Sequence, residues 1–241
     1  MIIMPKSLIL FDMDGTLIIQ KERPVYTGTT TFHSSYLSIK EHMKQIVVKY
    51  GIPLHLVSGL DRMASIWNTT IRYLEDQRYP EDQIKNIITE INVPFMIEER
   101  SDYDVSILLP GTIDGLESLK QMEYELGLVT TASRESYDRI SNSENYERFG
   151  RYFTYSVTRD ECRYIKPEPE PINKILEYFG TSSFVYVGDS DHDAQACKTA
   201  GGDFILINTR GYDRETINEI EPNIVINSLE ELPDVITRIH S

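Results

Sequence analysis

The chain has 241 residues, a hydrophobic content of 40% and a formal net charge of −14. This length and composition are typical of a globular protein with one large or two smaller domains, and they exclude a disordered chain. The acidic charge argues against nucleic acid as a partner, because no run of Lys and Arg reverses the repulsion locally. It would also repel an anionic substrate, so a phosphate site must supply its own positive charge.

The sequence also bears on the compartment. No apolar stretch is long enough to span a membrane, and the apolar run at residues 8–11 is too short for a signal peptide. Cys162 and Cys197 lie far apart and do not form a disulfide framework. We therefore expect a cytoplasmic protein, monomeric or homodimeric, with no membrane partner.

The first predicted strand, residues 8–11, is followed by a long segment of different character. Apolar residues recur at helical spacing through residues 20–108, and no convincing strand interrupts them. These apolar stripes are Met43, Ile46, Val47 and Tyr50, then Met63, Ile66, Trp67, Ile71 and Leu74, then Ile84, Ile87, Ile88 and Ile91. We predict a helical cap domain over 20–108, inserted into a core domain of residues 1–19 and 109–241, with Trp67 in the apolar core.

From residue 110 onward, short apolar runs alternate with helical stretches. The runs predict strands at 126–129, 153–157, 184–187, 204–207 and 224–226. Near-continuous apolar strands are typical of a parallel sheet that is covered on both faces. A helix over 171–179, stopped by Gly180, is an example of the intervening stretches. The alternation predicts an α/β fold with a doubly wound, Rossmann-like parallel sheet.

Polar residues follow three of the predicted strands. Asp12 and Asp14 follow the first, Thr130 and Thr131 the second, and residues 188–193, Gly-Asp-Ser-Asp-His-Asp, follow another. Ligands of open α/β sheets gather at the carboxyl ends of strands, so these groups should converge. Crowded carboxylates repel one another unless a cation joins them. Oxygen ligands without a His or Cys cluster indicate Mg²⁺.

These residues resemble, in order, the four motifs of the haloacid dehalogenase-like superfamily. The motifs are Asp-x-Asp-Gly-Thr at Asp12, the strand-end Thr130, Lys-Pro at Lys166 and Gly-Asp-x-x-x-Asp at Gly188. The helical insert resembles the cap of the phosphoglycolate phosphatase and β-phosphoglucomutase branch. The resemblance covers nearly the whole chain. It implies a Mg²⁺-dependent phosphoric monoester hydrolase that acts on a small phosphorylated metabolite.

The resemblance also implies a role for each acidic residue. Asp12 would attack phosphorus and form an aspartyl-phosphate, and Asp14 would act first as general acid and then as general base. The side chains of Asp12 and Asp189 and the backbone carbonyl of Asp14 would hold Mg²⁺. Asp193 would complete or orient that shell. The acid at Asp14 excludes the dehalogenases, which lack it, and the phosphonatases, which carry a small residue there.

The remaining motif residues would bind the phosphoryl group. The Thr130 hydroxyl and nearby backbone N–H groups, including the region of Thr131, would bind its oxygens, while Lys166 stabilises the charge in the transition state. Asp191 and His192 lie between the matched acids Asp189 and Asp193. The sequence fits a functional role and a position as solvated loop residues equally well.

The cap carries a weaker resemblance. Residues 56–62 resemble the cap loop of β-phosphoglucomutases, which makes Arg62 a candidate substrate contact; a plain surface Arg is the alternative. His33 resembles a hinge His of the mutases, but Ile18-Ile19-Gln20 replaces the acidic pair that the family usually has after its first motif. A sugar-phosphate mutase and a non-catalytic binding module are therefore the alternative functions, and the intact acid pair argues against the second.

Overall fold

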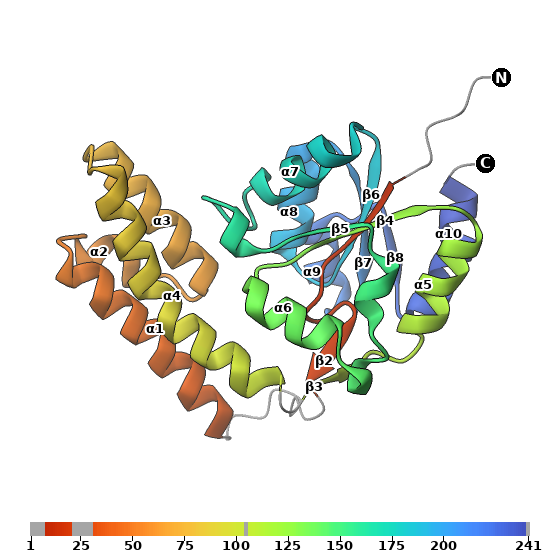
Figure 1. Ribbon diagram of the computed structural model, residues 1–241, viewed down its shortest axis with the longest axis horizontal. Helices are drawn as coiled ribbons and strands as arrows, with labels where there is room; N and C mark the ends of the chain where they lie inside the picture. Colours follow the sequence, from red (N-terminus) through yellow and green to blue (C-terminus); the bar gives the residue numbers. More distant parts are fainter. Residues whose placement is uncertain (1–7, 21–30, 104–105, 240–241) are drawn as a thin grey trace.

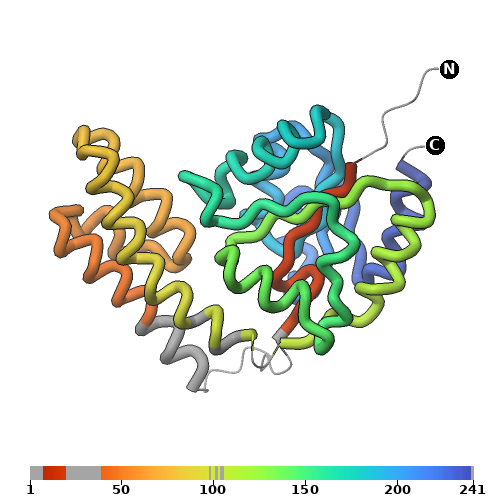
Figure 2. Tube along the Cα trace, viewed as in Figure 1, coloured from red at the N-terminus to blue at the C-terminus, as the bar shows by residue number. Residues whose placement is uncertain are grey.

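The computed structural model describes residues 8–20, 31–103 and 106–239 (Figures 1 and 2). Within these residues, a six-stranded sheet has the order β5-β4-β1-β6-β7-β8, and each neighbouring pair is parallel. Because the strand order runs outward from β1 in both directions, the sheet is doubly wound, and the predicted fold class is confirmed. The strands are β1 (Leu8–Phe11), β4 (Glu125–Val129), β5 (Tyr155–Val157), β6 (Phe184–Gly188), β7 (Asp203–Ile207) and β8 (Ile224–Ile226).

Both faces of the sheet are covered by helices, as its apolar strands require. Successive side chains of a strand point to opposite faces, so Leu8 and Leu10 belong to one buried cluster and Ile9 and Phe11 to another. The first cluster packs against α7 (Glu170–Phe179), α8 (Asp191–Ala200) and α9 (Arg214–Ile220). The second packs against α5 (Thr112–Gln121), α6 (Arg134–Ser141) and α10 (Leu232–Ile239). Figure 1 shows α5 and α10 together on the side of the sheet away from α7 and α8.

Two details of the predicted strands are wrong. The strand predicted at 153–157 begins only at Tyr155, because the Phe153 N–H closes a turn on the Gly150 carbonyl (3.1 Å). In addition, β2 (Ile18–Gln20) and β3 (Ser106–Leu108) form an antiparallel pair where the chain enters and leaves the helical segment. No strand was expected within 20–108. Each of these strands has three residues, which is too short to show an alternating hydrophobic pattern in the sequence. Their pairing also joins residues from the two ends of the insert.

The inserted segment consists of helices that lie to one side of the sheet (Figure 1). They are α1 (Thr31–Lys49), α2 (Leu54–Val57), α3 (Met63–Asp76) and α4 (Glu81–Tyr103). Their apolar stripes face one another, so that Val47, Ile66 and Ile91 are buried. Trp67 is also buried, as predicted, with its Nε1–H donating to the Arg163 carbonyl (3.0 Å). The division into a core and a cap domain at residues 20 and 108 stays a prediction.

Both cysteines lie close in sequence to predicted site residues, Cys162 before Lys166 and Cys197 one turn after Asp193 in α8. Cys162 and Cys197 are buried and unpaired, and burial raises the pKa of each thiol to about 12. None of the described helices has the length and apolar character that crossing a bilayer requires.

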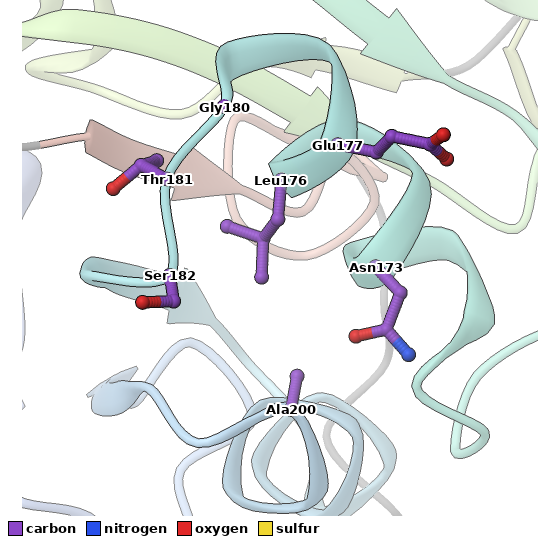
Figure 3. Close-up of a pocket in the computed structure, with 7 residues that line it drawn as sticks. All are labelled: Asn173, Leu176, Glu177, Gly180, Thr181, Ser182 and Ala200. Carbon is purple, nitrogen blue, oxygen red and sulfur yellow. The ribbon is translucent and has the colours of Figure 1, made fainter.

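The pocket in Figure 3 lies between α7 and Ala200. Ala200 ends α8, whereas Asp193 lies in its first turn, roughly 10 Å away along the axis.

Candidate active site

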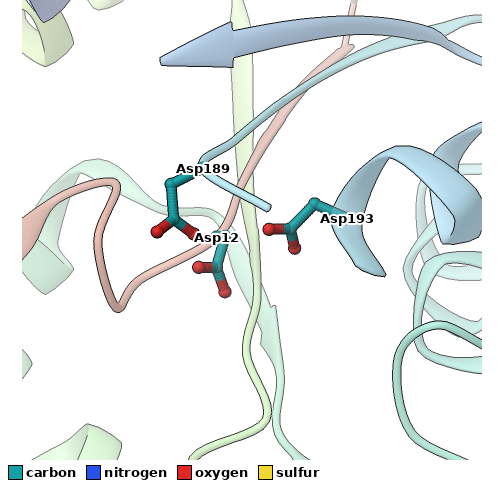
Figure 4. Close-up of side chains that lie close together, drawn as sticks. All are labelled: Asp12, Asp189 and Asp193. Atoms are coloured by element: carbon teal, nitrogen blue, oxygen red, sulfur yellow. The ribbon is translucent and has the colours of Figure 1, made fainter. Parts of the chain in front are cut away.

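Asp12, Asp189 and Asp193 form a buried carboxylate cluster. Each offers a carboxylate oxygen within 4.8 Å of the others, and their carboxylates converge in Figure 4. The sheet brings them together, because Asp12 directly follows β1, Asp189 directly follows the adjacent strand β6, and Asp193 lies in the first turn of α8. The three carboxylates are therefore held in a region that needs compensating positive charge.

Lys166 supplies part of this charge. Its Nζ donates to Asp12 Oδ1 (2.5 Å), Asp193 Oδ1 (2.6 Å), the Tyr186 hydroxyl (3.0 Å) and the Val129 carbonyl (3.2 Å). Burial alone would lower the pKa of Lys166, but the carboxylates of Asp12 and Asp193 raise it, so the side chain carries its charge.

Asp12 needs more positive charge than Lys166 provides. Burial raises the pKa of Asp12, and Asp193 and Asp189 raise it further, although Lys166 works in the opposite direction. A protonated carboxyl group is a poor nucleophile. A divalent cation beside Asp12 and Asp189 would restore the carboxylate, which is why the donor set of this cluster fits a metal site.

Asp193 is held on both of its oxygens. Oδ1 accepts from Lys166, while Oδ2 accepts from the Ser190 hydroxyl (2.5 Å) and the Ser190 N–H (3.1 Å). Ser190 is also the N-cap of α8, so the capping box of this helix fixes the Asp193 side chain. Although burial alone would raise it, the pKa of Asp193 is lowered by Lys166 and Ser190.

Asp189 has a partner that the motif analysis missed. Arg210 Nε donates to Asp189 Oδ2 (2.6 Å). Next to it, the Thr209 hydroxyl donates to the Gly15 carbonyl (2.5 Å), which connects the loop after β7 to the turn after Asp14. A signal for these residues existed, because they follow a predicted strand at the same edge of the sheet.

Asp14 lies in different surroundings from Asp12. Its carboxylate is partly exposed, and its Oδ2 accepts from the Tyr103 hydroxyl (3.1 Å). Burial and the nearby Asp14 raise the pKa of Tyr103, so the phenol keeps the proton that it donates. Gly15 has φ of +87°, and a Cβ there would lie 2.0 Å from Asp189 Oδ2. The turn after Asp14 can approach Asp189 this closely only with glycine.

Thr130 and Thr131 follow β4, the strand on the other side of β1. The Thr130 side chain is buried, and its oxygen accepts from the Ala132 N–H (3.0 Å). An accepting hydroxyl still has its own proton to donate. Thr131 is partly exposed, and its carbonyl accepts from Arg159 Nη1 (2.7 Å). Sequence patterns gave no indication of Arg159, which follows β5 and is fully buried.

Arg62 of the inserted segment contacts the motif that carries Asp189. Arg62 Nη1 lies 2.6 Å from Asp191 Oδ1, and both side chains are partly exposed. Although burial alone would raise it, the pKa of Asp191 is lowered by this pair. Burial and the charge of Arg62 lower the pKa of His192 to about 4, so its imidazole is neutral at pH 7. Asp191 is therefore an ion-pair partner. The side chain of His33 lies outside the described part of the structure.

Comparisons with known proteins agree with this geometry. Residues 9–207 match the haloacid dehalogenase-like hydrolase family, and the chain belongs to this family. It is therefore a hydrolase of that family, as predicted.

Relatives and solved structures of similar extent are known. The chain is 26% identical to pyrophosphatase PpaX from Bacillus velezensis, covering 94% of each chain, and 24% identical to the protein of that name from Bacillus mycoides, covering 97% of this chain and 98% of the other. Its fold is similar to that of a predicted phosphoglycolate phosphatase from Haemophilus somnus (TM-score 0.57, 18% identity, 97% and 99% covered). It is also similar to that of a proposed β-phosphoglucomutase from Thermotoga maritima (TM-score 0.56, 21% identity, 97% and 99% covered).

Proposed function

We propose that this protein is a Mg²⁺-dependent phosphatase of a small phosphorylated metabolite, acting through an aspartyl-phosphate on Asp12. The observation that carries the proposal is the buried cluster of Asp12, Asp189 and Asp193, joined by Lys166 at the carboxyl edge of the sheet. Buried carboxylates that repel one another are costly unless cations compensate them, and a bound cation would in turn attract an anionic substrate. The names of the PpaX and phosphoglycolate phosphatase relatives support the same reaction class.

The cluster fits Mg²⁺ by its chemistry. Its ligands are oxygens, and no His or Cys belongs to it within the described residues. Asp12 and Asp189 would hold the ion through their side chains and Asp14 through its carbonyl. Asp193 would orient the shell, because Lys166 and Ser190 already occupy its oxygens. When bound, Mg²⁺ supplies positive charge that draws phosphoryl oxygens to Asp12 and keeps its carboxylate ionised.

Asp12 acts as the nucleophile, and Asp14 transfers the protons. A carboxylate oxygen of Asp12 attacks phosphorus, the bond from phosphorus to the leaving oxygen breaks, and Asp14 gives that oxygen a proton. In the second step Asp14 takes a proton from water, which attacks the aspartyl-phosphate and releases inorganic phosphate. Tyr103 holds the Asp14 carboxylate by the hydrogen bond to its Oδ2.

Thr130, Thr131 and Lys166 hold the phosphoryl group. The Thr130 hydroxyl, with its oxygen already accepting from Ala132 N–H, would donate its proton to a phosphoryl oxygen. Backbone N–H groups around Thr131 would bind the same group. Lys166 would share its charge between Asp12 and the oxygens that gain charge in the transition state.

Residues 20–108 would form a cap that selects the leaving group, with Arg62, which pairs with Asp191, as the cation that binds it. Asp191 neutralises Arg62, and an anionic group on the substrate would compete with Asp191 for it. A second candidate substrate is pyrophosphate, favoured by the name of the PpaX relatives at 24% and 26% identity. Its leaving phosphate is anionic and needs a cation of this kind.

The test is hydrolysis of an aryl phosphate with and without Mg²⁺, followed by a screen of phosphorylated metabolites that includes pyrophosphate. We expect Mg²⁺-dependent release of phosphate and at least a thousandfold lower kcat for Asp12→Asn, which keeps the shape of the side chain but cannot form the acyl phosphate. If this variant retained a tenth or more of the wild-type kcat, or if a chelator had no effect, the proposal would be wrong.

A further inference from the structure

The helix α3 of the inserted segment contacts the loop that carries Lys166, which we call the lysine loop (residues 163–168). The strongest contact is between Asn68 of α3 and the backbone of Ile165. Asn68 Nδ2 donates to the Ile165 carbonyl (2.7 Å), and Asn68 Oδ1 accepts from the Ile165 N–H (3.0 Å). One amide side chain therefore satisfies both backbone groups of the residue directly before Lys166.

This contact is buried and has further hydrogen bonds beside it. Asn68 is 3% exposed and Ile165 is 0% exposed. One residue earlier in α3, Trp67 donates to the Arg163 carbonyl (3.0 Å). On the same face of the helix, Glu75 accepts from the Arg163 guanidinium and the Tyr164 hydroxyl. A buried amide that is satisfied on both sides holds its partner in one register, because any displacement leaves polar groups without a partner.

The first residues of the lysine loop are also held by the core. Glu170, in the first turn of α7, accepts from the Arg163 N–H (2.9 Å) and the Tyr164 N–H (2.8 Å). Within the described structure, Ile165 and Lys166 have no such bond to Glu170. Ile165 also accepts from the Glu168 N–H within the loop (3.1 Å), and the described hydrogen bonds that tie Ile165 to another element are those from Asn68 of α3.

We propose that Asn68 is a positioning residue for Lys166, so that the inserted segment takes part in assembling the phosphoryl-binding site as well as in covering it. This rests on the proposed role of Lys166. Its Nζ must lie within hydrogen-bond distance of Asp12 and Asp193 at once, and it now does so at 2.5 and 2.6 Å. A shift of the loop by about 1 Å is enough to lower a rate roughly a hundredfold.

The kinetic test is Asn68→Ala with an aryl phosphate and Mg²⁺. We expect kcat to fall by about tenfold to a hundredfold with little change in KM, because Lys166 acts on the transition state. In a Lys166→Ala background the same substitution should have no further effect. The matched control is Thr70→Ala, which removes another buried polar group of α3, whose hydroxyl donates within the helix to the Ile66 carbonyl (2.7 Å). An equal loss from Asn68→Ala in both backgrounds, or an equal loss in the control, would overturn the proposal.

A second measurement does not depend on activity. The Lys166 side chain is 4% exposed, so an amine-acylating reagent followed by peptide mass spectrometry should label it slowly in the wild type. We expect labelling of Lys166 to rise several-fold in Asn68→Ala and to stay unchanged in Thr70→Ala. Unchanged labelling of Lys166 in Asn68→Ala would overturn the positioning role. If labelling rises as expected but the wild type has no phosphatase activity, only the proposed function would be overturned. If Asn68→Ala does not fold, Trp67→Phe, which loses the bond to the Arg163 carbonyl, should show a smaller rise.

Discussion

Asp12 and Asp14 are two residues apart in sequence, but their side chains have different neighbours. Asp12 is 5% exposed and faces Lys166 and the other cluster acids. Asp14 is partly exposed, and its Oδ2 accepts from the Tyr103 hydroxyl. Two carboxylates in such different surroundings can serve as nucleophile and as acid in one reaction.

We predict that Asp14→Asn slows alkyl phosphates much more than aryl phosphates. An alkoxide needs a proton to leave, whereas a phenolate needs little help, so the difference should be at least about tenfold in kcat/KM. Release of phosphate from the phospho-enzyme should also slow, because the attacking water loses its base. Rapid-quench measurement of both steps on both ester types is the test. Equal slowing of the first step for both would identify Asp14 as structural.

At the scale of elements, α3 and α4 contact the loops and helices that surround the sheet. Arg62, the N-cap of α3, pairs with Asp191 at the start of α8. Glu99 of α4 pairs with the fully buried Arg159 and accepts from the hydroxyls of Ser133 (2.8 Å) and Ser136 (2.7 Å) at the start of α6. The pair of Arg62 with Asp191 is solvent-accessible, so a ligand can replace Asp191. The pair of Glu99 with Arg159 is buried and holds α4 against the core.

Arg62→Ala should raise KM for the natural substrate more than it lowers kcat. Its contact would be with the leaving group, remote from the reacting phosphorus, so the binding energy is lost from ground state and transition state alike. Steady-state kinetics on the best metabolite from the screen is the measurement. Lys49→Ala, which removes an exposed pair with Glu90 within the inserted segment, is the control and should change neither constant. A loss confined to kcat would contradict this role.

Glu99→Ala should lower the free energy of unfolding by about 3 kcal/mol, because it leaves the Arg159 guanidinium buried without its counter-ion. Adding Arg159→Met should restore part of the loss. Denaturation in urea provides both values. The control is Arg100→Ala in the same helix, whose pair with Glu135 is exposed and should contribute less than about 1 kcal/mol. Equal effects of Glu99→Ala and Arg100→Ala would refute the argument.

At the scale of the whole molecule, the order of the sheet decides where the chemistry lies. β4, β1 and β6 are adjacent, so residues from positions 12, 130 and 189 meet at one edge. The carboxylates of Asp12, Asp189 and Asp193 at this edge are compensated by Lys166 and Arg210, on a protein whose net charge is −14. Several cations of the inserted segment, such as Lys44, Lys49 and Arg100, already pair with carboxylates, whereas a mutase has to hold a second phosphate in its cap.

We predict that inorganic phosphate accumulates with each turnover and that no sugar bisphosphate is needed as activator. A phosphatase admits water to the phospho-enzyme, whereas a mutase must exclude it. The measurement compares phosphate release with isomer formation on glucose 1-phosphates supplied with trace bisphosphate. Rapid isomerisation with negligible phosphate release would reassign the protein as a mutase, and Asp12 would remain the predicted nucleophile.

The sequence alone determined the fold class, the strands near 8–11, 184–187 and 204–207, and the acids of the cluster. These features are readable because strand hydrophobicity and motif spacing are local, and because the carboxyl ends of parallel strands converge by geometry. Tertiary structure alone decided the rest. The partners Tyr103 and Asn68 reach the site across 89 and 97 residues of chain. Contacts between residues so far apart leave no periodic pattern in the sequence, because only the packed chain determines which side chains meet.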